Sequence, residues 1–178
     1  CYARAMPTPA QVTAAIVRAV DSATTGWTVV QAQQDAVRLA VPYITVQSVT
    51  DEIAFGWPHE DIVDDDLVVS TPRQARYWIT AYGAGGQGVL AAVGPLLLTT
   101  RTPHALALQA AGISPQRVGG PRNLTAAYRS GEEPRAQIDF VVQYVLSSTD
   151  TDDVDAANRI VVGVVGEPDG PTLSLEVP

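Results

Sequence analysis

The chain has 178 residues, no lysine, 11 arginines and 19 acidic residues, which give a net charge of −8. Its 46% apolar content excludes a disordered tail, and its length fits one domain. We expect neither a membrane span, which needs ~20 consecutive apolar residues, nor a signal peptide. Cys1 is the only cysteine, so no intrachain disulfide forms, and the acidic balance argues against tight nucleic-acid binding, which needs clustered cations.

The first predicted element is an amphipathic helix near Pro9–Ala23, which Gly26 ends. Thr8 and Gln11 have the spacing of a capping box, and Pro9 suits the first helical turn. Apolar residues at helical spacing form one stripe, so we expect this helix to pack on another layer. The stripe consists of Val12, Ile16, Ala19, Val20 and Ala23.

Strands are predicted next. Pro42 suits the start of a strand at Tyr43–Val49, whereas Trp27–Leu39 is compatible with strand or helix. Gly56–Asp66 is acidic and is predicted to be a solvated loop or a hairpin tip. Arg73–Tyr82 alternates like a strand, and the aromatic residues on its second face indicate that this face is not simply solvated. Its two faces are Tyr77, Ile79 and Ala81 on one side and Arg76, Trp78, Thr80 and Tyr82 on the other.

A glycine-rich turn leads into a second helical pattern, with apolar residues at helical spacing over residues 89–97. Gly94 and Pro95 lie inside this pattern, so we expect the helix to kink or to split in two. A third, short helix is predicted to begin after Thr102 and to end at Gly112.

The most regular strand is Ala136–Leu146, with six consecutive period-two matches. Ser147–Asp155 is predicted to be an acidic turn that leads to a hairpin partner at Arg159–Val165. The order of elements predicts an α+β fold, a mainly antiparallel sheet with helices packed on one face. We expect residues 1–166 to form a single domain and residues 167–178 to form a C-terminal extension.

Gly83–Gly88 matches the G-x-G-x-x-G pattern of dinucleotide sites and lies between a strand and a helix. The preceding strand, however, alternates and carries Arg73 and Arg76, whereas a central parallel strand is almost continuously apolar. No acidic residue lies in Arg101–Ala110, where the ribose ligand would fall, and no second βαβ unit follows. A flexible turn is the favoured interpretation, and a small dinucleotide-binding enzyme remains a remote alternative.

The other candidate chemistry is weak. The acidic residues of Gly56–Asp66 and Ser147–Asp155 lack the spacing of a calcium loop, and the zinc pattern H-E-x-x-H is absent, so both are interpreted as solvated segments. Cys1, His59 and His104 do not lie in a recognisable nucleophile motif. We therefore predict no catalytic residue, no cofactor and no metal.

The segment Tyr128–Tyr144 resembles the tail terminator or neck terminator proteins of tailed bacteriophages. Arg76–Gly83 is similar to the central strand of that family, and Pro103–Pro115 and Pro121–Tyr128 to its helix and following loop. The resemblance covers Pro9–Val165 and depends on the order of elements. The residues of the first segment that carry it are Tyr128, Glu133, Arg135, Ala136, Asp139, Phe140 and Tyr144.

The resemblance implies a structural role. Such proteins assemble as a ring, typically of six subunits, at the head-proximal end of the tail tube, and they present the other face to neck or head-completion proteins. In contractile tails they also meet the terminal sheath ring. The implied location is the virion, after synthesis in the host bacterial cytoplasm, with no membrane contact. Another head–tail connector or a tube-like ring protein is the nearest alternative.

A ring of identical subunits needs two different contact surfaces on each copy. The strand Arg73–Tyr82, which has apolar or aromatic residues on both faces, could supply one surface. The alternating apolar residues of the C-terminal extension could supply another by adding a strand to a neighbour's sheet. Arg135 lies beside Glu132 and Glu133, so it could form an intersubunit salt bridge or an intrachain clamp. The candidate contact residues are Arg76, Trp78, Tyr82, Glu133, Arg135, Leu173 and Leu175.

The acidity would suit a ring through which DNA passes without specific binding. Carboxylates that face the lumen would repel phosphates within ~8–10 Å at physiological salt. The candidate lumen or axial residues are Asp61, Asp64, Asp65, Asp66, Asp150, Asp152 and Asp153.

Overall fold

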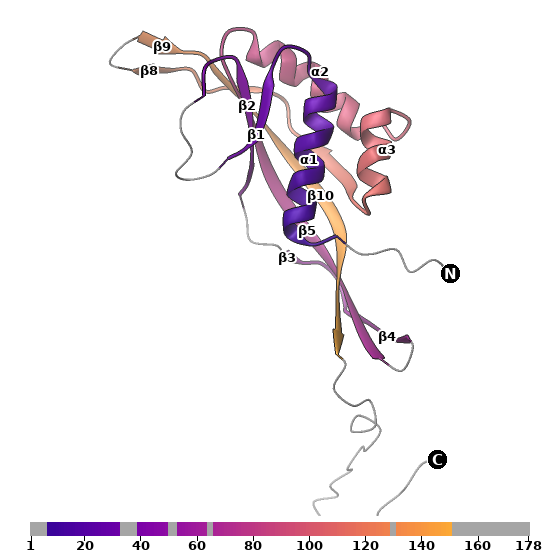
Figure 1. Ribbon diagram of the computed structural model, residues 1–178. Helices are drawn as coiled ribbons and strands as arrows, with labels where there is room; N and C mark the ends of the chain where they lie inside the picture. Colours follow the sequence, from indigo (N-terminus) through magenta and orange to yellow (C-terminus); the bar gives the residue numbers. More distant parts are fainter. Residues whose placement is uncertain (1–6, 33–38, 50–52, 64–65, 129–130, 151–178) are drawn as a thin grey trace, which may run out of the picture. The chain divides into compact units, whose positions relative to one another are not determined.

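The computed structural model describes residues 7–32, 39–49, 53–63, 66–128 and 131–150 (Figure 1). It contains three helices, α1 (Pro9–Ala23), α2 (Gly86–Leu98) and α3 (Pro103–Ala110), which lie on one face of a mostly antiparallel sheet. The α+β prediction is confirmed. Within the described ranges, no helix is both long enough and apolar enough to cross a bilayer.

The main sheet has the strand order β1–β2–β5–β10–β6. β1 pairs with β2 in parallel, whereas β2 with β5 and β10 with β6 are antiparallel pairs. Three short strands flank this order: β3 and β4 pair with β5, and β7 pairs with β10. β8 and β9 form a separate hairpin. The strands are β1 (Thr28–Gln31), β2 (Tyr43–Ser48), β3 (Ile53–Ala54), β4 (His59–Val63), β5 (Asp66–Tyr82), β6 (Ser114–Val118), β7 (Arg122–Asn123), β8 (Ala126–Tyr128), β9 (Gly131–Glu133) and β10 (Arg135–Asp150).

The chain divides into two compact units. The first unit contains Cys1–Pro58 and Thr71–Leu146 and holds all three helices. The described part of the second unit consists of residues 59–63, 66–70 and 147–150 and includes the hairpin of β4 with the first residues of β5.

Local sequence explains α1 well. The Thr8 hydroxyl accepts a hydrogen bond from the Gln11 backbone N–H at 3.4 Å, and the Gln11 side chain accepts one from the Thr8 N–H at 2.8 Å. This capping box satisfies two backbone donors that a helix start leaves free. The predicted apolar stripe is buried except at Ala23, which packs half-buried against the core. Both the helix and its inward face are therefore as predicted.

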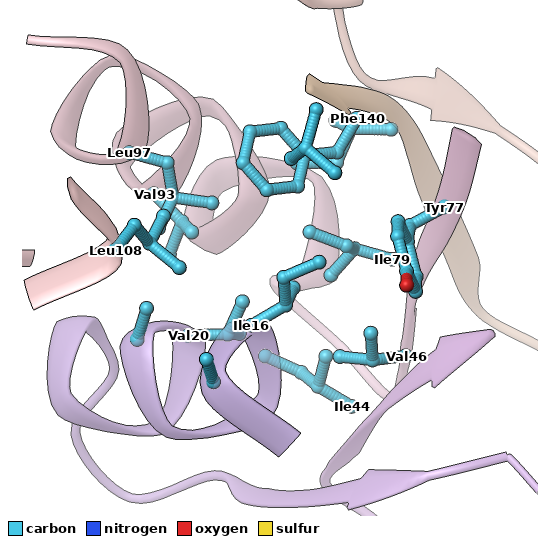
Figure 2. Packing of buried hydrophobic residues seen from close by; sticks show 14 of the residues in the cluster. Ile16, Val20, Ile44, Val46, Tyr77, Ile79, Val93, Leu97, Leu108 and Phe140 are labelled. Atoms are coloured by element: carbon cyan, nitrogen blue, oxygen red, sulfur yellow. The ribbon is translucent and has the colours of Figure 1, made fainter. Parts of the chain in front are cut away.

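The hydrophobic core lies between the helices and one face of the sheet (Figure 2). Alternate residues of β5 and β10 point into it, and each fully buried large apolar side chain contributes about 1.5–3 kcal/mol relative to exposure. Thr13 of α1 reaches across to hydrogen-bond the Tyr77 hydroxyl at 3.2 Å. The residues labelled in the core are Ile16, Val20, Ile44, Val46, Tyr77, Ile79, Val93, Leu97, Leu108 and Phe140.

Two expectations are corrected, and one open alternative is decided. α2 continues across Gly94 and Pro95 to Leu98, so the alternative of two separate helices is wrong. Pro95 has no N–H to donate to the Ala91 carbonyl, so α2 lacks one backbone hydrogen bond there, and the helix ends soon afterwards at Leu98. Ser147–Asp150 continues β10 instead of turning. Of the two alternatives for Gly56–Asp66, a solvated loop or a hairpin tip, the structure has a hairpin, in which His59–Val63 pairs with the first residues of β5 despite its acidic composition. The expected strand Arg159–Val165 lies outside the described residues.

Candidate interaction surface

One face of the sheet carries no helix in the part of the chain that the structure describes (Figure 1). Residues that pair directly on antiparallel strands share a face. Tyr43 pairs with Tyr82 and Gln47 with Trp78, and these residues alternate with the core residues of β2 and β5. We call this surface the helix-free face. It therefore holds the outward aromatic residues that the sequence predicts.

Aromatic stacking joins two strands on this face. The rings of Tyr43 and Tyr82 stack with centroids 4.6 Å apart and planes 9° from parallel. The guanidinium of Arg135 lies 4.9 Å from the centroid of the Tyr82 ring, close enough for a cation–π interaction. One stack therefore links β2 and β5 to the start of β10.

Arg135 also forms an ion pair with Glu133. Its Nε donates to a carboxylate oxygen of Glu133 at 3.0 Å, and one of its terminal nitrogens donates to the same oxygen. Glu133 is only 8% exposed, so this pair is largely shielded from water. The structure thus contains the intrachain clamp, which is one of the two roles that the sequence predicts for Arg135. The other role, an intersubunit salt bridge, stays a prediction.

Replacing Arg135 with alanine is expected to lower the free energy of unfolding by about 1–3 kcal/mol, because it removes charged hydrogen bonds to a buried carboxylate. Urea unfolding measures this loss. The matched control is Arg76→Ala, an exposed position on the helix-free face, which should change stability by no more than about 0.5 kcal/mol. Equal stability of the two variants would contradict a stabilising clamp.

A second network lies beside the stack. With its amide oxygen turned toward them, Gln137 accepts hydrogen bonds from Trp78 Nε1 and from Arg122, each at 3.2 Å. Arg122 in turn donates to both carboxylate oxygens of Asp139, at 3.0 and 2.9 Å. Sequence reasoning missed Arg122 and Gln137 as site residues. The period-two alternation of β10 could have found Gln137, because it places this residue beside Asp139 on the outward face.

The predicted acidic residues are not brought into one site by the structure. Asp61 is exposed on β4, where its carboxylate accepts a hydrogen bond from the Ile62 N–H at 3.0 Å, and Asp66 is half-buried at the start of β5. Asp150 is the last residue of β10. The remaining predicted residues, Asp64, Asp65, Asp152, Asp153, Leu173 and Leu175, lie outside the described residues. Within the described ranges, no group of three His, Cys, Asp or Glu residues is placed to hold a metal ion.

The glycine motif has a packing explanation. Gly85 caps α2 with φ +81°, and Gly83 has φ +126° with its would-be Cβ 3.3 Å from Pro42. A Cβ on Gly86 would lie 2.9 Å from that of Ala81, which is closer than real Cβ atoms approach. The strand before the motif is also paired antiparallel with β2, unlike the parallel strands of a dinucleotide fold. These glycines therefore serve a tight strand-to-helix turn.

Comparison with known proteins agrees with this arrangement. A family model described as phage neck terminator protein matches residues 10–169. No curated protein matches the chain significantly. The match extends from α1 through the main sheet, and it includes both networks of the helix-free face. The chain therefore belongs to the phage neck terminator family, whose members are structural proteins of the bacteriophage neck and tail.

Proposed function

We propose that copies of this chain close into a ring, of six subunits by resemblance to the family, that caps the head-proximal end of the tail tube. The other side of the ring joins neck or head-completion proteins and, in a contractile tail, meets the terminal sheath ring. The role is structural and involves no catalysis. The observation that carries the proposal is the helix-free face, on which aromatic rings and arginines are held by stacking, cation–π contact and hydrogen bonds rather than by a covering helix.

The composition of this face suits protein–protein contact. Tyr, Trp and Arg are enriched at interfaces and at their energetic centres. Here the Tyr43–Tyr82 stack and the Arg135–Glu133 pair already hold their side chains in place. Side chains that are ordered before binding lose less conformational entropy on association, so a prearranged face favours tight docking.

The direct test is an assembly experiment. The solution mass of the purified chain is measured alone and with tail tube ends, and the complexes are imaged by electron microscopy. We expect a closed ring on one end of each tube, and tubes of uncontrolled length when the chain is omitted. Tubes that stop at normal length without it, or a chain that occupies another layer of the virion, would contradict the proposal and favour a connector or tube-like role.

The intersubunit alternative for Arg135 enters the same experiment. If Arg135 also contacts a neighbouring copy, Arg135→Ala loses assembly while its far-UV circular dichroism stays that of the wild type. An unchanged oligomer contradicts this role and leaves Arg135 as an intrachain clamp alone.

Residues 167–178 are proposed to contact a neighbouring subunit, because Leu173, Leu175 and Val177 alternate like an added strand. Deleting these residues is expected to weaken or abolish ring formation, as measured by solution mass, because the neighbour loses that strand. Rings of unaltered mass and stability from the truncated chain would remove this proposal.

The acidic segments are proposed to face the lumen, where their charge would keep passing DNA from binding. Asp61 and Asp66 are the residues of this set whose side chains the structure describes. Their position in a density map of the neck is the test: carboxylates on the inner wall support the proposal, and carboxylates on the outer rim contradict it.

A further inference from the structure

Two exposed surfaces of the first compact unit are formed by uncharged side chains. The first is a strip formed by Ile53, Phe55 and Trp57, which we call the aromatic strip. These side chains are 60%, 54% and 92% exposed. No charged residue occurs in Ile53–Pro58. Large apolar side chains gathered in this way on a surface mark interaction sites more often than isolated ones do.

The register of β3 places Ile53, and by alternation Phe55, on the helix-free face. Ile53 pairs with Gln74 of β5, and the Phe55 N–H donates to the Pro72 carbonyl at 2.8 Å. Gln74 alternates with the buried residues Ala75 and Tyr77, which point toward the helices. Because paired residues share a face, Ile53 points away from the helices.

The second surface lies on the opposite side of the sheet, on the outward side of α2. Its exposed residues follow helical spacing, and the other side of α2 packs into the core through Val93 and Leu97 (Figure 2). The only charged residue between Gly83 and Gln116 is Arg101, although 17% of the chain is charged. We call this surface the α2 surface. Its members are Ala91, Ala92, Pro95 and Leu98.

We propose that the aromatic strip of one copy packs on the α2 surface of the next copy and that this pair forms the repeating contact of the ring. The inference rests on the proposed function and names the contact within it. Each copy carries a net charge of −8, so copies repel one another unless they meet through uncharged surfaces. Two different uncharged surfaces on opposite faces of one sheet match a head-to-tail contact, whereas a single partner protein requires only one of them.

The size of the strip fits a substantial contact. Each aromatic side chain buries roughly 150–250 Å² when it is fully covered. Phe55 and Trp57 would therefore supply a large part of the core of an interface that buries about 800 Å² per partner. Small side chains such as Ala91 and Ala92 leave room for these rings against the helix.

The experiment uses two full-length variants, Trp57→Glu and Ala92→Glu, each of which blocks one surface only. We expect each variant alone to remain monomeric under conditions in which the wild type assembles, with tube ends supplied if the wild type requires them. An equimolar mixture should yield a heterodimer in sedimentation, because the intact strip of Ala92→Glu docks on the intact α2 surface of Trp57→Glu. Combining Trp57→Glu with Ala92→Arg in one chain should restore assembly through opposite charges.

Controls separate the possible outcomes. Val41→Glu, an exposed apolar position outside both surfaces, should assemble like the wild type, and all variants should keep the wild-type thermal midpoint. If a glutamate variant does not fold, Phe55→Ser and Leu98→Ser replace the pair.

Rings that persist in Trp57→Glu, or a mixture that stays monomeric, would overturn the inference and leave the proposed function standing. Rings of Trp57→Glu that form but no longer cap tubes would indicate that the strip contacts the tube protein instead of a neighbouring copy. Loss of assembly in Val41→Glu would show that the effect of a glutamate is not specific to the two surfaces. A wild-type chain that never assembles, even on tube ends, would overturn the proposed function itself.

Discussion

Replacing Phe140 with alanine is expected to lower the free energy of unfolding by about 3–5 kcal/mol. Phe140 is fully buried on β10, and it lies in the core between the sheet and the helices (Figure 2). The substitution removes apolar contacts and leaves a cavity that the surrounding strands and helices fill only in part. Urea unfolding followed by circular dichroism measures the change through the denaturation midpoint.

Val141→Ala is the matched control, because the next residue of the same strand points to the helix-free face and is half-buried. Its expected cost is less than about 1.5 kcal/mol, since only part of its surface leaves water on folding. Similar losses for both variants would contradict the assignment of the inward and outward faces of β10.

Alanine at Gly86 is expected to destabilise the protein by about 1–3 kcal/mol, whereas alanine at Gly88 is expected to stabilise it by about 0.4–1 kcal/mol. The two positions are two residues apart in the first turn of α2. A Cβ at Gly86 meets that of Ala81 at 2.9 Å, and a Cβ at Gly88 meets no atom within 4 Å. Thermal unfolding of the two variants measures whether each substitution raises or lowers the stability of the protein.

These opposite signs also test the interpretation of the glycine motif. Gly86 is required by close packing, and Gly88 is a replaceable position on the helix surface. If Gly86→Ala were as stable as the wild type, the close approach to Ala81 would not constrain the turn. Saturable binding of NAD(P) that either variant abolishes would favour the dinucleotide site over a tight turn.

The parts of the fold that local chemistry determines were predictable. The capping box and apolar stripe of α1 gave its bounds, and the structure has the same helix, Pro9–Ala23. Alternation predicted the core of β10, because every second residue from Ala136 to Tyr144 is buried. The end of α3 was predictable for a similar reason: Gly112 has φ +78°, and Ile113 N–H donates to the Leu108 carbonyl at 3.0 Å.

The parts that depend on distant pairing were not predictable. β6 has the sequence Ser-Pro-Gln-Arg-Val, which lacks alternation, and it is a strand because it pairs with Phe140–Gln143 of β10. The pairing contains a register shift between Val141 and Val142, which no local pattern indicates. Acidic composition likewise suggested solvated segments at β4 and at the end of β10, where the structure has strands.

On the candidate interaction surface, too, residues set by local sequence were predictable, and residues brought together by distant pairing were not. Trp78 and Tyr82 were predicted from alternation within one strand, and Arg135 and Glu133 from their nearness in sequence. Arg122 was missed because its contacts with Asp139 and Gln137 bridge β7 and β10, and residues far apart in sequence come together only through the sheet. The aromatic strip also required the register of β3 with β5 before its face could be assigned.

The exposure of Trp57 gives the protein an intrinsic optical signal. Trp57 is 92% exposed, whereas Trp27 packs half-buried against the core. Indole fluorescence moves to shorter wavelengths when water leaves the ring, so docking of one copy on another should shift the emission spectrum without any added dye. A version of the chain that keeps Trp57 and carries phenylalanine at its other two tryptophans would report the approach of a neighbour in real time.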